Sequence, residues 1–343
     1  MIKIIKDDTA LWDEIEHCHT LFFSEYVQNW YSAFLAQRTD SHAQFVKDFI
    51  NPIFNNLCLC NLSDMDIYIS DFKNRFKSTF NKNLHKDDTD LKAIKEYLNQ
   101  IYDYGKFSKN ENILSNHSKK EHWNRHTLLS AIPVKICPYC NRTHISSYAD
   151  EEGKQKTTAD CDHFFNKATY PFLALSLYNF IPSCGVCNER FKLAIDFHKA
   201  RHLYPYDRCF DSAGVSFATR STDSSLSYLT KFTHDFEIMI LNPSDDSEAG
   251  NSIKTFRLKE LYQSHKCDAI DVIEDSIIYS KSQKKEFQST GLFSGESEIE
   301  RYIPSRYVYD STKNPSRPLR KLINDIFLEV EEYIMISNAV STS

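Results

Sequence analysis

The sequence predicts an α+β chain that is mostly helical, with a compact central module between two helical regions. Glycine is sparse, with 7 residues in 343, while Tyr and Phe are abundant, a composition that favours helix. Apolar residues recur at helical spacing on both sides of the centre, whereas the centre holds short extended segments and a polar turn. We expect a helical N-terminal region at 1–130, the module at 131–200 and a mixed, mainly helical region at 201–343.

Helical periodicity is clearest in the N-terminal region. From Leu11 to Gln37 the apolar residues fall on one face and predict one or two amphipathic helices. Either Thr89 or Asp90 is a suitable N-cap, and the polar run Lys106–Lys120 is the best candidate for a linker. Three further helices are expected at Phe45–Phe54, Asp66–Phe80 and Asp90–Tyr104.

Between Lys73 and Arg125, basic and aromatic residues are interleaved. Such a stretch could track a nucleic-acid backbone. Acidic residues are mixed in throughout, however, which is typical of a solvated helix face. The second interpretation is favoured.

Four cysteines frame the central module. The motif CPYC spans Cys137–Cys140, and CGVC spans Cys184–Cys187. Two residues between cysteines let both sulfurs approach one ion at about 2.3 Å, and two such turns complete a closed tetrahedral site for structural zinc. The remaining cysteines are expected to be free thiols in or near cores, namely Cys18, Cys58, Cys60, Cys161, Cys209 and Cys267.

The order of elements inside the module is also predicted. Pro133–Ile136 should be extended, and the polar turn Asp150–Gly153 is typical of a hairpin. The arms of that hairpin would be Thr143–Ala149 and Lys156–His163. We then expect a short helix that begins at Pro171, a strand and a further helix, at Tyr170–Tyr178, Asn179–Ser183 and Asn188–His198.

Residues suited to hydrolytic chemistry lie between and after the cysteines. Asp162 and His163 are adjacent, Asn179 follows, and Asn188 comes directly after the last cysteine, with Lys192 one helical turn later. Carboxylate and amide oxygens are hard ligands for Mg²⁺, and an adjacent imidazole can take a proton near neutral pH. Singly, each would be an ordinary structural residue. Together, within the cysteine frame, they suit a metal-assisted reaction.

The order C-x-x-C, D-H, N, C-x-x-C-N-x-x-x-K resembles the HNH endonucleases of the ββα-metal superfamily in their zinc-stabilised form. The longer stretch DHFFNKATYPFLALSLYNFIPSCGVCN is more narrowly similar to PtuB, the HNH subunit of Septu-type antiviral defence systems, which also accompanies some retrons. The match spans roughly Cys137–Lys192 and implies a ββα-metal fold for the module. One departure is Asn166-Lys167, where related sequences read Pro-Lys.

This resemblance implies a role for each matched residue. His163 would be the general base that deprotonates the attacking water, and Asp162 and Asn188 would hold one Mg²⁺ or Mn²⁺ ion on the scissile phosphate. Asn179 would hold the hairpin loop and so orient His163. Lys192 could contact phosphate, or could equally be a lysine on a solvated helix. Zinc would be structural, because four thiolates leave no open coordination position.

Other polar residues receive structural assignments. His144 is expected on the surface, and Cys161 in a strand facing the core. A second metal at His198, His202 and Cys209 would lack a third clear ligand and is a weak hypothesis.

The C-terminal region should mix strand, turn and helix. Asp223–Ile240 suggests strand and loop, and Leu241–Asp246 suggests a turn. Loops are expected at Ser289–Ser297 and Pro304–Pro318. Amphipathic helices are expected at Thr255–Tyr279 and Leu319–Ile336.

Hydrophobic patterning and net charge limit the possible cellular location and binding partners. Residues Met1–Ala10 lack the apolar core of a signal peptide, and no apolar run reaches the roughly 18 residues of a membrane span, so we expect a cytoplasmic protein. The net charge of −6 argues against a protein that coats nucleic acid, because such binding is driven by neutralising phosphates. Any nucleic-acid contact should therefore be a local patch.

The sequence thus predicts a metal-dependent HNH endonuclease. By resemblance the substrate is DNA rather than RNA, and the partner is an ATPase related to ABC and SMC-type ATPases (PtuA), in some systems with a retron reverse transcriptase and its msDNA; no membrane is involved. The competing hypothesis is a zinc-ribbon-like module that binds nucleic acid or protein without catalysis. A binding module has no need of an imidazole beside hard metal ligands, and a nuclease does.

Overall fold

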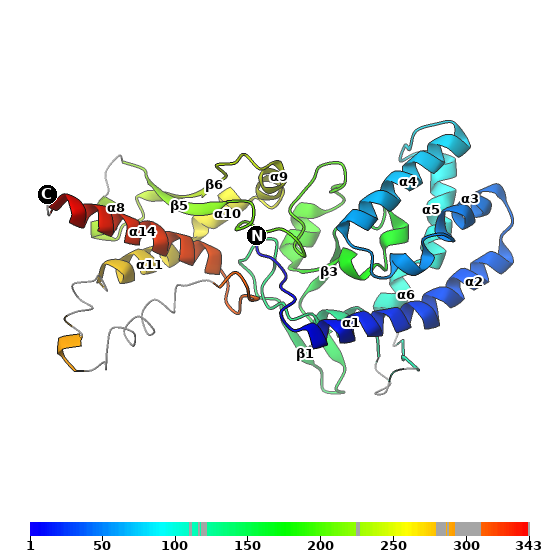
Figure 1. Ribbon diagram of the computed structural model, residues 1–343, viewed down its shortest axis with the longest axis horizontal. Coiled ribbons are helices and arrows are strands. Elements are labelled where there is room, and N and C mark those ends of the chain that lie inside the picture. The colour runs from blue at the N-terminus through cyan, green and yellow to red at the C-terminus, as the bar shows by residue number, and fades with distance from the viewer. Residues whose placement is uncertain are drawn as a thin grey trace. The chain divides into compact units, whose positions relative to one another are not determined.

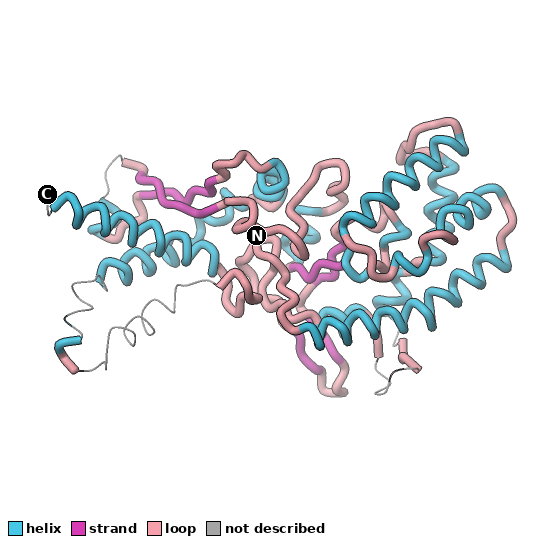
Figure 2. The backbone as a smooth tube through the Cα atoms, in the orientation of Figure 1, coloured by secondary structure: helices cyan, strands magenta, loops and turns pink. Residues whose placement is uncertain are grey.

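The computed structural model describes residues 1–109, 112–115, 117, 122–223, 227–278, 286, 288–291 and 310–341 (Figures 1 and 2). Helices make up about half of the chain, and the described strands form small antiparallel pairs, which confirms the α+β class. The chain divides into two compact units. The first holds residues 6–134 and 145–206; the second holds residues 1–5, 135–144 and 207–343. Most of the predicted module therefore packs in the same unit as the N-terminal helices.

The first unit begins with a long helical path. Helix α1 (Thr9–Phe22), the π-helical turn η1 (Phe23–Val27) and α2 (Gln28–Gln37) follow one another without a break. The periodicity from Leu11 to Gln37 is therefore confirmed as helix. The next elements are α3 (Ser41–Ile50), the 3₁₀ turn η2 (Phe54–Leu57), α4 (Leu62–Phe80), α5 (Thr89–Ile101), α6 (Tyr104–Lys109) and α7 (Arg125–Ala131).

Side-chain caps set where these helices begin. The N-cap of α5 is Asp88, whose carboxylate accepts hydrogen bonds from the N–H groups of Asp90 and Leu91 at 2.9 and 3.1 Å. The predicted caps Thr89 and Asp90 are wrong, because Asp88 keeps an extended backbone and both residues lie inside the first turn. The predicted linker Lys106–Lys120 overlaps α6, and part of it lies outside the described residues.

Aromatic side chains join these helices to the central module. Phe172 packs against Phe49 of α3 and Phe72 of α4, with ring centroids 5.0 and 5.3 Å apart. Phe107 of α6 stacks on Phe180 at 5.6 Å and an interplanar angle of 9°. Burying a phenylalanine contributes about 2–3 kcal/mol, so these contacts fix the module on the helices.

The module contains two hairpins and a helical turn. Strand β1 (Ser147–Ala149) pairs with β2 (Gln155–Thr157) across the predicted polar turn. Strand β3 (Asp160–His163) pairs antiparallel with β4 (Phe180–Ser183), in the register Asp160↔Ser183 to His163↔Phe180. The π-type helical turn η5 (Val186–Lys192) follows β4. The predicted strand Asn179–Ser183 is confirmed, whereas the predicted arm Lys156–His163 is divided between two sheets.

Two predicted helices of the module are shorter than expected. Instead of one helix at Tyr170–Tyr178, two 3₁₀ turns form, η3 (Pro171–Leu173) and η4 (Leu177–Asn179), because Ser176 between them is extended. The helix predicted at Asn188–His198 ends at Lys192, because Leu193 has a φ of 48°.

The second unit is built around another antiparallel pair. Strand β5 (Ser216–Ser221), which was not predicted, pairs with β6 (Phe236–Leu241). The predicted helix Thr255–Tyr279 is broken, because Arg257 has a left-handed backbone with a φ of 50°. The predicted loop Ser289–Ser297 lies largely outside the described residues, whereas the described part of Pro304–Pro318, residues 310–318, is turn and coil as predicted. The helical elements are α8 (Ser227–Lys231), α9 (Ser247–Thr255), α10 (Leu258–Tyr262), η6 (Gln263–His265), α11 (Lys266–Ile278) and α14 (Arg320–Ser341), the last of which confirms Leu319–Ile336.

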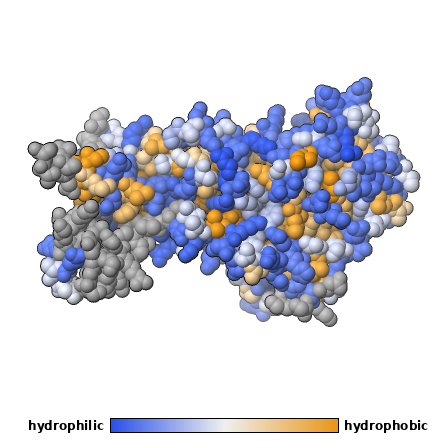
Figure 3. Space-filling view, viewed as in Figure 1, coloured by the Kyte–Doolittle hydropathy of each residue, from blue (hydrophilic) through white to orange (hydrophobic). Residues whose placement is uncertain are grey.

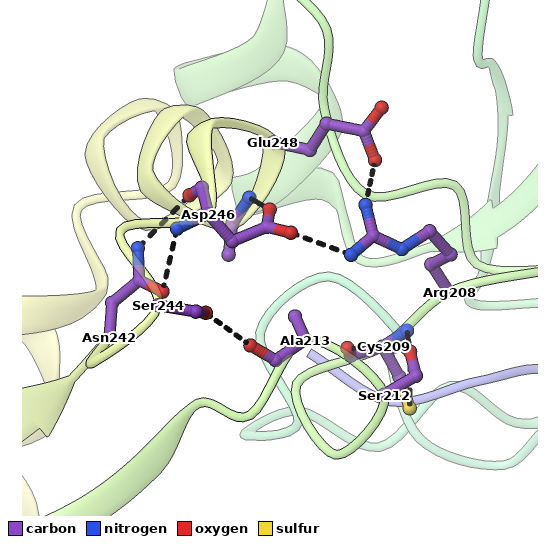
Figure 4. A network of polar contacts seen from close by, with 9 residues as sticks. Arg208, Cys209, Ser212, Ala213, Asn242, Ser244, Asp246 and Glu248 are labelled. Carbon is purple, nitrogen blue, oxygen red and sulfur yellow. Dashed lines mark hydrogen bonds and ion pairs between the residues drawn. The ribbon is translucent and has the colours of Figure 1, made fainter.

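Polar contacts hold the start of α9 (Figure 4). The carboxylate of Asp246 caps the helix at the N–H of Ala249, and Arg208 makes ion pairs with Asp246 and Glu248. The side-chain amide of Asn242 bonds both the N–H and the C=O of Asp246. This network is structural, since every group in it is paired within the unit.

On the face seen in Figure 3, hydrophilic residues predominate and apolar residues form separate patches. Within the described residues we find no helix whose length and apolar content would let it span a lipid bilayer.

Candidate functional site

Four buried cysteines form a cluster of the kind that binds metal. The sulfurs of Cys137, Cys140, Cys184 and Cys187 all lie within 4.8 Å of one another, and none is in a disulfide. The turn after the first pair is tight, with Asn141 N–H donating to Cys137 O at 2.8 Å and Asn141 at a φ of 53°. Four soft thiolates match a closed tetrahedral zinc site. The predicted cluster is therefore present, and its donor set fits structural zinc.

The other cysteines are reduced. Burial raises the pKa of Cys60 and Cys161 to about 12, so these thiols stay protonated and inert. Cys161 is buried in β3, as predicted, and His144 is exposed. Cys267 is exposed rather than near a core. His198, His202 and Cys209 do not appear together in any ligand cluster of the described residues.

Strand β3 places side chains alternately on two faces. On one face, Asp162 Oδ1 accepts a hydrogen bond from Lys192 Nζ at 2.9 Å, and Asp160 Oδ2 accepts one from Asn188 Nδ2 at 3.1 Å. Asn188 and Lys192 are four residues apart on η5, so they meet two carboxylates that are two residues apart on β3. The predicted metal ligands Asp162 and Asn188 thus take part in two neighbouring contacts between β3 and η5.

Lys192 is buried rather than solvated. Its side chain is 1 % exposed, and its ammonium also donates to the backbone oxygen of His163. The solvated-helix alternative is therefore wrong. As the structure stands, the ammonium neutralises Asp162 instead of facing solvent.

His163 is buried and neutral. Its Nε2 lies 3.0 Å from the carbonyl oxygen of Ala174, and a carbonyl can only accept, so Nε2 carries the proton and Nδ1 keeps a lone pair. Burial, followed by the nearby charge of Lys167, lowers the pKa of His163 well below its usual value. The imidazole meets the rings of Tyr104 and Phe180 edge-on, with centroids 4.7 and 5.1 Å away.

Asn179 fastens the loop that follows His163. Its amide oxygen accepts from the N–H of Phe165 at 2.7 Å, and its Nδ2 donates to the carbonyls of Phe165 and Leu173 at 3.0 and 2.9 Å. The side chain is completely buried, so these bonds use all of its donors and one acceptor site away from water. Asn179 therefore holds the β3–β4 loop, and with it the carbonyl that orients His163.

Several residues close to His163 were not predicted. Asp160 could have been found, since it lies two residues before Asp162 and so on the same strand face. Lys167 lies in the loop after His163, in the dipeptide Asn166-Lys167 that departs from the PtuB pattern. Tyr104 and Arg125 come from α6 and α7, and no sequence pattern connects them with this site.

Comparisons with family models, with curated proteins and with solved structures gave no match for this chain.

Proposed function

We propose that the chain is a metal-dependent HNH endonuclease that hydrolyses phosphodiester bonds of DNA. The observation that carries the proposal is the antiparallel pair β3–β4 followed by the helical turn η5, which brings Asp162-His163, Asn179 and Asn188 into one small unit. That strand–strand–helix order agrees with the resemblance. The four-cysteine cluster agrees with its zinc-stabilised form.

The chain's own residues suit the roles that the resemblance implies. His163 would take a proton from water at Nδ1, because Nε2 is committed to Ala174. Asn179 keeps the loop, and hence that tautomer, in place. The oxygens of Asp162 and Asn188, with Asp160 beside them, are hard donors that fit Mg²⁺ or Mn²⁺. Such an ion, when bound, would offset negative charge that develops on the phosphate.

One observation favours the competing hypothesis of a non-catalytic zinc-ribbon-like binding module. Asp162 and His163 are only 3 % and 5 % exposed, which is typical of residues with structural roles. Under that hypothesis the Lys192–Asp162 ion pair would simply stabilise the module. Catalysis instead requires that substrate and water reach Nδ1 of His163.

By resemblance, we propose that the nuclease acts in cytoplasmic antiviral defence with a PtuA-like ABC/SMC-type ATPase, and in a retron setting with a reverse transcriptase and its msDNA. The chain's net charge of −6 supports a division of labour in which the partner captures DNA. Exposed apolar side chains beside the proposed site are available for a protein contact: Val186, Leu193 and Ile195 are 48 %, 61 % and 38 % exposed.

The proposal is tested by the metal dependence of cleavage. DNA cutting should need Mg²⁺ or Mn²⁺ and stop with EDTA, while the more tightly held zinc is retained. Asp162→Ala and Asn188→Ala should require more metal for any residual activity. Cutting that is equally strong in EDTA would contradict the proposal. Purification from the native host should also bring down an ATPase; its absence would contradict the partner assignment but not the chemistry.

A further inference from the structure

A tyrosine and two cations gather around His163 on the face of β3 opposite to Asp162. The Tyr104 ring meets the imidazole edge-on, with centroids 4.7 Å apart and an interplanar angle of 76°. The ammonium of Lys167 lies 3.9 Å from the centroid of the same tyrosine ring. Tyr104 thus holds the head of Lys167 close to His163.

Arg125, the first residue of α7, adds a second cation to this group. Its guanidinium lies near the Tyr104 hydroxyl and the Cys161 thiol, and its charge acts on both. Its Nε also donates to Nε2 of His126 at 3.4 Å. Burial raises the pKa of Tyr104, so its hydroxyl stays neutral and does not offset the two positive charges.

The two cations differ from Lys192 in their partners. Lys192 is neutralised by Asp162, whereas neither Arg125 nor Lys167 makes an ion pair with a carboxylate anywhere in the described part of the chain. Both remain accessible, since Lys167 is exposed and Arg125 is half-buried. Two accessible cations near one another repel, and an anion between them would remove that repulsion.

We propose that Arg125 and Lys167 form a phosphate-binding subsite in front of His163, which takes a backbone phosphate of the nucleic-acid substrate. The guanidinium can bind phosphate oxygens through two parallel N–H bonds, and the ammonium adds a point charge. That the anion is a nucleic-acid phosphate rests on the proposed nuclease function. Arg125 and Tyr104 belong to α7 and α6, so the N-terminal helices then contribute directly to substrate binding.

A binding experiment that does not depend on cutting tests this subsite. In a His163→Ala background, Arg125→Gln and Lys167→Gln are compared with Lys167→Arg, which keeps the charge. Lys77→Gln is the control, because Lys77 is exposed on α4. The probe is a short fluorescein-labelled DNA duplex, and its dissociation constant is measured by anisotropy over a range of salt concentrations. Zinc content and circular dichroism verify folding of each variant.

Each Gln variant should weaken binding about tenfold and lower the slope of log Kd against log salt by about one. Lys167→Arg and Lys77→Gln should remain near the parent protein. Unchanged affinity and slope in both Gln variants, or no measurable binding by the parent, would overturn the subsite. This experiment measures binding and not cutting, so it tests the subsite separately from the nuclease proposal. A wild-type chain that binds DNA through these residues but does not cut it would contradict only the nuclease proposal.

Discussion

The ammonium of Lys192 lies 2.9 Å from Oδ1 of Asp162, and both side chains are almost completely buried. Removing one partner of such a pair leaves the other as an unpaired charge in a low dielectric. Lys192→Met should therefore lower the free energy of unfolding by about 3–5 kcal/mol. Urea denaturation followed by circular dichroism measures this change.

Lys199→Met is the matched control for that pair, because Lys199 is exposed and close in sequence. It should stay within about 0.5 kcal/mol of wild type. If Asp162 is a metal ligand, Mg²⁺ should recover part of the lost stability in Lys192→Met and have less effect on wild type. Equal stability of Lys192→Met and wild type would show that the Lys192–Asp162 ion pair does not stabilise the fold.

Asn179 and Asn188 should respond differently to alanine. Asn179 makes three buried hydrogen bonds, so Asn179→Ala leaves several groups unsatisfied and should cost about 3 kcal/mol or more. Asn188 is half-buried and makes one side-chain bond to Asp160, so Asn188→Ala should cost about 1 kcal/mol. Thermal and urea unfolding of the two variants give the comparison, and a larger loss for Asn188→Ala would contradict it.

The cysteine cluster predicts about one tightly held zinc per chain. Cys184→Ser should lose that zinc and unfold at much lower denaturant concentration, since metal binding is coupled to folding. Cys267→Ser, at an exposed cysteine outside the cluster, should keep both zinc and stability. Elemental analysis of the purified proteins decides the matter, and a fully folded, zinc-free Cys184→Ser protein would rule out the structural role.

Protonation of the buried His19 should destabilise the folded chain in acid. Its Nε2 donates to Leu175 O at 2.8 Å, its Nδ1 accepts from Trp123 Nε1 at 3.1 Å, and burial lowers its pKa to about 4. An unfolded histidine has a pKa of about 6.5, so between about pH 6.5 and 4 the unfolded chain binds a proton that the folded chain does not. The free energy of unfolding should therefore fall by about 3 kcal/mol over this window from His19 alone.

His19→Gln isolates this contribution, because glutamine keeps an amide donor and acceptor but does not titrate. The variant should be less stable than wild type near neutral pH and lose less stability on acidification. Unfolding curves at the two ends of the window measure the difference. A wild-type advantage that is the same at both ends would mean that His19 does not titrate as described.

Long amphipathic segments were predictable, since α1, α4 and α14 each bury one apolar stripe at helical spacing. The short elements were not. Strand β5 carries few apolar residues and is stabilised from outside, where Asp325 and Glu329 of α14 accept from the N–H groups of Phe217 and Thr219. The local sequence of Ser216–Ser221 does not indicate this contact with α14.

In the candidate site, too, some features were predictable from local sequence and others were not. Spacing alone predicted the cysteine cluster, because a C-x-x-C turn fixes two sulfurs locally. The burial of Lys192 on Asp162 depends on how η5 packs on β3, and the contact of Tyr104 with His163 depends on how α6 packs on the β3–β4 pair. These contacts join residues far apart in sequence, so composition and periodicity do not predict them.

We propose that His163 is the base of a nuclease, and cleavage by two histidine variants tests this role. Wild type, His163→Ala and the exposed-histidine control His144→Ala are incubated with DNA and Mg²⁺, alone and with the proteins that co-purify from the native host. We expect wild type and His144→Ala to cut, and His163→Ala to be inactive with unchanged zinc content and fold. Equal cutting by His163→Ala, or no cutting by wild type under either condition, would contradict the account.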